Sequence, residues 1–366
     1  MRKFNPKNER IKRQYFTFLK EAKRQSEATV DGVAKAISRF EQYTKMRDFK
    51  AFHFEQAIGF KKHLAGCTSQ QTGKPLSKST MKSTTAALKA FFQWLHMQSG
   101  YKSTVSYSDA EYFNLSEKDT RIASAKRTRA VPTVEQIKHV LKCMPTVTVV
   151  QKRNRALVAF VLLTGTRDRA LVSFKLKHIN LAERSVFFDA REVATKASKT
   201  FTTYFFPVGD EIVSILEDWV GYLRTELLFC EDDPLFPKTL VSPGASQSFE
   251  AVGVVPEHWS NAAPVRKIFR QAFEAAGLPY FNPHTVRSTL AQLGERLCKR
   301  PVEFKAWSQN LGHEGVLTTL YSYGEVQQAE QAKIIGSICD SSAEAIDDAA
   351  FELIADLQAL IKSRVA

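Results

Sequence analysis

The sequence predicts a mainly α-helical protein of two domains, the second of which carries a small antiparallel β-sheet. Three observations lead to this fold class. The chain has 366 residues, more than one compact core usually organises. Apolar residues recur at three-to-four spacing along most of it. Residues 185–189 and 201–208 instead alternate apolar with polar side chains or are rich in aromatic ones, as short strands are.

The first domain is expected over residues 1–110 and has a helical pattern. Its last helix carries an apolar stripe that would face a core. The stripe consists of Leu88, Phe91, Phe92 and Leu95. The predicted helices cover residues 11–22, 29–46, 54–65 and 77–97. The chain therefore opens with a small helical domain.

The net charge of +14 is concentrated in this first third. Residues 1–130 hold 26 basic and 11 acidic side chains, whereas residues 131–323 carry a net charge of +4 and residues 324–366 one of −5. Such a basic excess is typical of proteins that bind the phosphate backbone of nucleic acids, because neutralising phosphates releases condensed counterions. A merely soluble basic surface is the alternative. The candidate DNA-binding residues are Lys78, Lys82, Lys89, Lys126, Arg127 and Arg129.

A basic interdomain linker is expected over residues 111–130, because residues 102–129 lack sustained periodicity and end in a basic run. The second domain is expected over residues 131–340. It opens at Thr133, which forms a capping-box pattern with Gln136.

Helices dominate the pattern of the second domain on either side of its two short strands. Residues 234–260, rich in Pro, Gly and Ser, are expected to form a long loop. Residues 341–366 are expected to form a final amphipathic helix, which would pack on its own domain or be exchanged between subunits. The other predicted helices cover residues 154–163, 210–227, 262–276, 284–298 and 302–311.

Several functional classes are disfavoured by what the sequence lacks. It has no apolar run of about 18 residues, and its basic, polar amino terminus leads into no apolar core, so we expect no membrane contact and a cytoplasmic location. The five cysteines are scattered without a CxxC pair, which disfavours a disulfide framework or a zinc site. The GxxxxGK[ST], GxGxxG, HExxH and GxSxG motifs are also missing, which disfavours nucleotide hydrolysis and zinc-protease chemistry.

Four polar residues stand in otherwise apolar stretches of the second domain. Arg167 follows Leu-Thr-Gly-Thr, His284 precedes Arg287 by three residues, and His313 follows Asn-Leu-Gly. Singly, an arginine more often pairs with a carboxylate or a helix end, and a histidine is more often a hydrogen-bonded core or capping residue. Together they favour a phosphate site, because guanidinium forks match phosphodiester oxygens.

In their order along the chain these residues resemble the tyrosine recombinase (phage integrase) family. The pattern is Thr-Gly-x-Arg, a lysine in a strand hairpin, His-x-x-Arg, Leu-Gly-His, and a tyrosine after a Thr-Thr pair. The resemblance spans nearly the whole chain. It implies a helical, SAM-like core-site DNA-binding domain and a catalytic domain with the DNA breaking-rejoining fold, which close around DNA as a C-shaped clamp.

The resemblance also implies an enzyme, a site-specific recombinase (integrase) that cuts and rejoins DNA through a 3′-phosphotyrosyl intermediate and a Holliday junction. Because the covalent adduct stores the bond energy, no metal, ATP or other cofactor is implied. The implied partner is double-stranded DNA carrying recombination sites. Four subunits would act on two synapsed sites and be monomers or weak oligomers when free, with accessory DNA-bending or directionality factors. We expect integration or excision of a bacterial mobile element.

By the same resemblance, Arg167 and Arg287 clamp the scissile phosphate and the extra charge of its transition state. His284 shares a helical face with Arg287, and it either transfers a proton at the nucleophile or donates a hydrogen bond to the phosphate. His313 donates a hydrogen bond to the same phosphate. Lys199, in the hairpin, protonates the leaving 5′-oxygen; Lys196 is the runner-up. The alternative for Lys199 is a hairpin lysine that only touches DNA.

The nucleophile is expected to be Tyr323, ten residues after His313, with Tyr321 as the runner-up. The family's commonest spacing is nine residues, where this chain has Ser322. Thr-Thr-x-x-Ser-Tyr-Gly resembles the ending found in a branch of bacterial integrases, which favours Tyr323. Tyr321 would then be an aromatic residue packed on the catalytic domain.

Ala170 is a second departure, since relatives usually carry there a glutamate that supports the active-site arginine. Asp168 is one candidate to support Arg167 instead. Trp307 either lines the site or packs in the core. Two other functions stay open: a catalytically silent, sequence-specific DNA-binding regulator with the same fold, and a topoisomerase IB-like relaxing enzyme.

Overall fold

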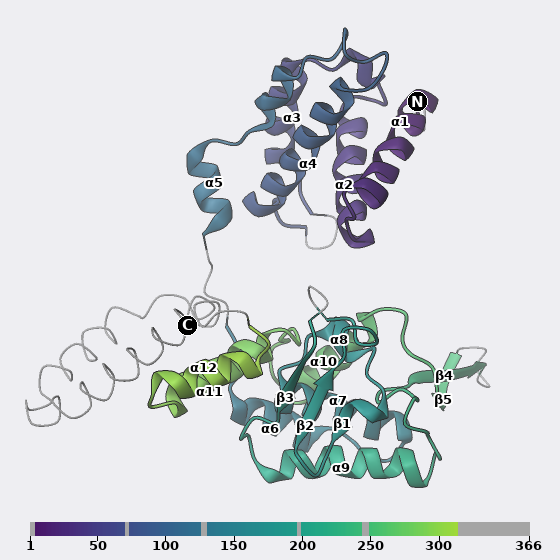
Figure 1. Ribbon diagram of the computed structural model, residues 1–366, viewed down its shortest axis with the longest axis vertical. Helices are drawn as coiled ribbons and strands as arrows, with labels where there is room; N and C mark the ends of the chain where they lie inside the picture. The colour runs from purple at the N-terminus through teal and green to yellow at the C-terminus, as the bar shows by residue number, and fades with distance from the viewer. Residues whose placement is uncertain (1–3, 70–72, 126–129, 196–198, 244–248, 314–366) are drawn as a thin grey trace, which may run out of the picture. The chain divides into compact units, whose positions relative to one another are not determined.

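The computed structural model describes residues 4–69, 73–125, 130–195, 199–243 and 249–313. The chain divides into two compact units, unit 1 (Met1–Lys126) and unit 2 (Arg127–Ala366) (Figure 1). Each unit has a hydrophobic core of its own.

Unit 1 is helical. Most of its helices begin at a residue whose side chain accepts a backbone N–H of the first turn, as Asn5, Ser26, Ser77 and Ser116 do. Its α-helices are α1 (Pro6–Thr17), α2 (Glu27–Tyr43), α3 (Phe54–Gly66), α4 (Lys78–His96) and α5 (Glu117–Ser124). Short η segments, one π-helical and two 3₁₀, lie at Phe18–Ala22, Phe49–Ala51 and Ser108–Phe113.

Aromatic rings fill the core of unit 1. Phe92 of α4 stacks on Phe52 with the ring centroids 3.7 Å apart, and Phe40 of α2 meets Phe92 edge-on at 5.2 Å. Part of the segment expected as a linker contacts this helical body: the 3₁₀ turn Ser108–Phe113 and α5 both pack on α4. The sequence did not predict this contact because α5 has no buried apolar stripe: one ion pair, Lys78–Asp119, and one hydrogen bond, Lys82–Ser124, join it to α4.

The described part of unit 2 is mostly helical and has two small antiparallel sheets. The first sheet has strand order β1-β2-β3, and the second pairs β4 with β5. The helices are α6 (Val134–Cys143), α7 (Val149–Thr164), α8 (Asp168–Leu171), α9 (Asp210–Thr225), α10 (Ala263–Ala275), α11 (Thr285–Leu297) and α12 (Pro301–Asn310), with a 3₁₀ turn at Leu176–His178. The strands are β1 (Ile179–Asn180), β2 (Ser185–Phe188), β3 (Phe201–Tyr204), β4 (Lys238–Pro243) and β5 (Phe249–Val255).

Helix α7 is central to unit 2 and sets the position of the site. Its residues 156–164 are all buried, and it contacts α6, α9, α11 and β5. The helix begins earlier than its apolar run predicts, because Thr148 and Gln151 form a capping box. It ends at Gly165, whose φ of +61° is left-handed.

The expectation of a long loop over residues 234–260 is wrong, because β4 and β5 form a hairpin there. Figure 1 shows this hairpin apart from the β1-β2-β3 sheet. Its strands carry exposed apolar side chains, Leu240, Val241 and Val252, and a register shift between Leu240 and Val241 breaks the alternation that identifies a strand. Among the helices that the structure describes, none combines the length and apolar character that crossing a bilayer requires.

Candidate active site

Arg287 is the centre of the candidate site. It lies on the first turn of α11 and is 7% exposed. Its Nη1 donates to Gly165 O at 2.5 Å, and its Nη2 donates to Leu311 O at 2.5 Å and lies 2.9 Å from His313 Nε2. One guanidinium thereby joins the end of α7, the start of α11 and the turn after α12.

The turn at Gly165 brings Arg167 into the same place. Gly165 has a left-handed φ that favours glycine, and a Cβ there would also lie 2.9 Å from Leu311 Cδ2 and 3.1 Å from Leu290 Cδ1. Arg167 follows as the N-cap residue of α8 and is partly buried, which lowers the pKa of its guanidinium.

A cavity of about 420 Å³ collects four of the predicted site residues. Arg167, Lys199, Arg287 and His313 all line it. They come from the start of α8, the approach to β3, α11 and the turn after α12. Cationic and neutral donors thus converge from four segments far apart in the sequence, as binding of a phosphodiester requires.

His284 occupies the N-cap position of α11 rather than the helix itself, and it is exposed. Its backbone dihedrals are helical, with φ −63° and ψ −24°, so the three-residue spacing to Arg287 acts as it does within a helix. The residues lining the cavity do not include His284, but its charge contributes to lowering the pKa of His313.

His313 is neutral at physiological pH. Burial, followed by the charges of Arg287, Arg167, His284 and Lys199, lowers the pKa of its imidazole to about 4. An arginine only donates hydrogen bonds, so His313 Nε2 accepts from Arg287 and the ring carries its proton on Nδ1.

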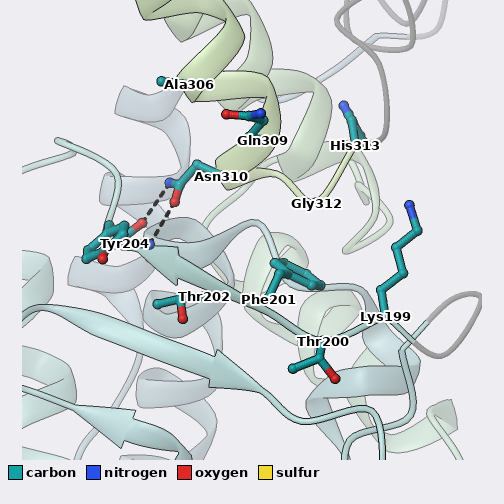
Figure 2. Close-up of a pocket in the computed structure, with 10 residues that line it drawn as sticks. All are labelled: Lys199, Thr200, Phe201, Thr202, Tyr204, Ala306, Gln309, Asn310, Gly312 and His313. Atoms are coloured by element: carbon teal, nitrogen blue, oxygen red, sulfur yellow. Dashed lines mark hydrogen bonds between the residues drawn. The ribbon is translucent and has the colours of Figure 1, made fainter. Parts of the chain in front are cut away.

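A groove of about 590 Å³ between β3 and α12 continues from the cavity, and we call it the β3–α12 groove. It shares Lys199, Gly312 and His313 with the cavity. Figure 2 shows Lys199 and His313 at one end of this groove and Tyr204 with Asn310 at the other.

Asp168 and Trp307 both bond residues that do not line the cavity. Asp168 Oδ2 accepts from Arg266 Nε at 2.9 Å and Nη2 at 2.8 Å, so the carboxylate pairs with α10. Trp307 Nε1 donates to Leu290 O at 2.9 Å and its ring lies 4.8 Å from that of Phe206. Trp307 therefore packs α12 on α11.

Ala170, where relatives usually carry a glutamate, is 2% exposed and lies at the edge of the cavity. Within the described ranges, no cluster of three or more His, Cys, Asp or Glu side chains is arranged to hold a metal ion.

The candidate DNA-binding lysines of α4 all contact the segment that follows the helical body. Lys78 pairs with Asp119 at 2.8 Å, Lys82 Nζ donates to Ser124 Oγ at 2.8 Å, and Lys89 pairs with Glu111 at 2.6 Å. These ion pairs are partly exposed.

Several predicted residues lie outside the part of the chain that the structure describes. They are both candidate nucleophiles, Tyr321 and Tyr323, the runner-up lysine Lys196, the basic run Lys126, Arg127 and Arg129, and the final segment 341–366.

Sequence reasoning missed two polar residues beside the cavity. Thr203 is 1% exposed although it lies in an edge strand, and its hydroxyl donates to Asn310 O at 2.9 Å. Asn310 bonds Tyr204 with both ends of its amide. In the sequence, the only sign of these contacts is the position of Thr203 in an aromatic-rich strand. The spacing of Asn310 does not indicate its partner.

Comparisons with known proteins agree with this arrangement. The family model described as "Phage integrase family" matches residues 131–330, more than half of the chain. Tyrosine recombinase XerC of Lactobacillus delbrueckii subsp. bulgaricus is 23% identical over 262 residues, which cover 70% of this chain and 76% of that protein.

Two solved structures resemble the fold. A lambda integrase dimer bound to a COC′ core site is 15% identical, with 87% of this chain and 78% of that chain covered and a TM-score of 0.57. The XerH site-specific recombinase bound to its difH substrate is 17% identical, with 88% and 84% covered and a TM-score of 0.53. The predicted fold class, mainly helical with a small antiparallel sheet, is confirmed. The match of the family model over most of unit 2 shows that the chain belongs to the phage integrase family, the tyrosine recombinases.

Proposed function

We propose that this protein is a site-specific DNA recombinase that cuts and rejoins strands through a 3′-phosphotyrosyl intermediate. The observation that carries the proposal is the convergence of Arg167, Lys199, Arg287 and His313 on one cavity. The relatives named above support a recombinase, and the lambda integrase and XerH structures were determined on DNA. Integration or excision of a mobile element in the cytoplasm is the biological role we propose.

In the proposed reaction the phenolic oxygen of Tyr323 attacks the scissile phosphorus, and the bond from phosphorus to the 5′-oxygen breaks. Lys199 donates a proton to that 5′-oxygen, and the phosphate stays joined to the tyrosine. The guanidinium groups of Arg167 and Arg287 and the imidazole of His313 stabilise the charge that develops on the nonbridging oxygens. His284 accepts the proton that the hydroxyl of Tyr323 loses as it attacks. Attack by a partner strand's 5′-hydroxyl reverses the step.

We further propose that residues 1–110 bind core-site DNA, residues 111–130 link them to a catalytic domain at 131–340, and four subunits act on two synapsed sites. Residues 341–366 would dock on a neighbouring subunit. Deleting them should weaken synapsis more than binding to one site, as measured by gel shift with one and two sites. Unchanged synapsis would rule out the docking role.

The decisive experiment uses candidate attachment-site DNA that carries a nick near the cleavage point. The protein is incubated with this DNA, denatured and digested, and mass spectrometry identifies the peptide that carries nucleotide. We expect the adduct on Tyr323. An adduct on Tyr321 keeps the reaction and changes the nucleophile, whereas tight binding without any adduct supports the DNA-binding regulator. Relaxation of DNA without a second site would indicate the topoisomerase-like activity.

A further inference from the structure

One side chain pairs with the outer edge of β3 at Tyr204. In the order β1-β2-β3 the strand β3 lies at the edge, so its outward peptide groups need partners other than β2. Asn310 Oδ1 accepts from Tyr204 N at 2.7 Å, and Asn310 Nδ2 donates to Tyr204 O at 2.8 Å (Figure 2). A primary amide offers a donor and an acceptor side by side, as a peptide group does, so Asn310 pairs with β3 as one more strand residue would.

The backbone of Asn310 is bound to the same strand. Asn310 is the last residue of α12, where carbonyl groups have no partner within the helix. Its carbonyl accepts from the hydroxyl of Thr203 at 2.9 Å. Three hydrogen bonds to two consecutive residues of β3 therefore fix the end of α12 in position and in rotation.

The two elements joined in this way carry two proposed site residues. Lys199 lies two residues before β3, and His313 lies three residues after Asn310. Gly312, between Asn310 and His313, has a left-handed φ of +68°. A Cβ there would lie 2.7 Å from Phe201 Cζ. The turn that carries His313 is thus packed directly on the strand that follows Lys199.

We propose that Asn310 is a positioning residue, which clamps the end of α12 to β3 and thereby holds His313 in register with Lys199. Arg287 holds the same turn from the side of α11, through Leu311 O and His313 Nε2. The turn is therefore held by hydrogen bonds on two sides, and loss of the clamp removes those to β3. The catalytic consequence rests on the proposed recombinase function, but the clamp itself does not.

The test compares the parent protein with Asn310→Leu, which keeps the size of the side chain and removes both amide bonds. The matched control is Gln309→Leu, one residue earlier, exposed and on the wall of the same groove. Two properties are measured: the rate of covalent adduct formation on nicked DNA at saturating protein, and the titration of the His313 ring by NMR in the free protein.

We expect Asn310→Leu to slow adduct formation by about 10-fold to 100-fold without changing DNA affinity, since displacing a reacting group by about 1 Å has this effect. The pKa of His313 should rise from about 4, because a released ring is better solvated and farther from Arg287, Arg167, His284 and Lys199. Gln309→Leu should match the parent in both measurements.

A parent-like adduct rate together with an unchanged His313 titration in Asn310→Leu would overturn the clamp. So would a loss of adduct matched by an equal loss of DNA affinity with the titration unchanged, because the effect would then be general. If Asn310→Leu does not fold, Thr203→Val removes the third bond alone and is judged by the same criteria. If the parent forms no adduct, the proposed function fails, and the titration alone decides the clamp.

Discussion

Arg287 combines a proposed phosphate-binding role with a structural one. Its guanidinium satisfies two backbone carbonyls from segments that belong to no common sheet or helix, and it also orients the ring of His313. Five N–H donors in a rigid fork make this possible. The proposed phosphate contact therefore uses a group that the fold already holds still, so little reorganisation is needed when phosphate binds.

Arg287→Lys keeps the positive charge but removes the planar guanidinium, and it should show that charge alone is not sufficient. One ammonium cannot reach Gly165 O, Leu311 O and His313 Nε2 together, so we expect a loss of about 1–3 kcal/mol in the free energy of unfolding. Adduct formation should fall by about 100-fold or more, the usual result of removing one transition-state donor. Urea unfolding and the nicked-DNA assay measure the two effects. Arg270→Lys, an exposed ion-paired residue of α10, is the control and should change neither.

His313 predicts a pH dependence of stability. Its pKa is about 4 in the folded protein against 6.5 in the unfolded chain, so unfolding takes up a proton between these values. The contribution is complete above pH 6.5 and is lost as the pH falls toward 4. Burial also lowers the pKa of His178 and His258, which act in the same window. Asp189, whose carboxyl pKa Arg191 holds at about 2, acts only at lower pH.

Replacement of His313 by Asn should therefore make the decrease in stability between pH 6.5 and 4 shallower without abolishing it. Urea midpoints measured across this range test the point. An unchanged slope in the variant would mean that His313 titrates normally in the folded protein.

For single residues, the sequence predicted several of the side chains that line the cavity. It did not predict the hydrogen bonds that position them. Arg167, Arg287 and His313 stood out because polar side chains interrupt apolar runs, and the structure places them on one cavity. Asn310 did not stand out. Its partner Tyr204 is 106 residues away, and an asparagine at a helix end has the same local pattern whether or not a strand edge lies beside it.

The β4–β5 hairpin shows that whole elements are also missed when they depend on contacts between distant residues. Most of the longer helices were predicted, some with displaced ends, because the 3.6-residue period is local. A two-stranded pair instead depends on a contact between strands. The hairpin is fastened to α7 by Arg153, which is 2% exposed and whose Nη1 donates to Pro237 O at 2.8 Å and to Thr239 Oγ1 at 2.9 Å. Its guanidinium carbon also lies 4.8 Å from the ring centroid of Trp259, and burial lowers the pKa of Arg153 to about 10.

Arg153→Met keeps the bulk of the side chain and should free the hairpin. We expect a loss of about 1–3 kcal/mol in the free energy of unfolding, because Pro237 O is left without its donor. Hydrogen exchange of β4 and β5 amides should rise more than that of β2 and β3 amides. The control is Lys152→Met, whose ammonium contacts the ring of Tyr222 at 4.3 Å. Equal exchange in both variants would show that Arg153 does not anchor the hairpin.

The basic charge of the protein and the candidate site lie in different units. Residues 1–130 carry a net charge of +15, more than the total of +14, whereas the cavity lies in unit 2. Each unit has its own core, so the two can be altered independently. The sequence indicated this division through its charge count, but not that Lys78, Lys82 and Lys89 contact Asp119, Ser124 and Glu111.

Lys82→Gln tests the proposed DNA contact on α4. We choose Lys82 because its partner, Ser124 Oγ, is neutral and the substitution leaves no unpaired acid. Binding should weaken uniformly across DNA sequences, and the slope of log affinity against log salt should fall by about one. The control is Lys20→Gln, which removes the same charge from an exposed ion pair with Glu27. An equal change of slope in the two variants would mean that Lys82 makes no contact of its own.

The bond between Arg287 and Gly165 also bears on how the chain matures during synthesis. The two residues are 122 positions apart, so at about 5–20 residues per second the ribosome adds the arginine about 6–24 seconds after the glycine. During that interval the chain already contains the basic residues of unit 1, while the carbonyl at the end of α7 still lacks its donor. Under the proposed function, the segment that would attract nucleic acid is therefore made before the residue that would hold a scissile phosphate.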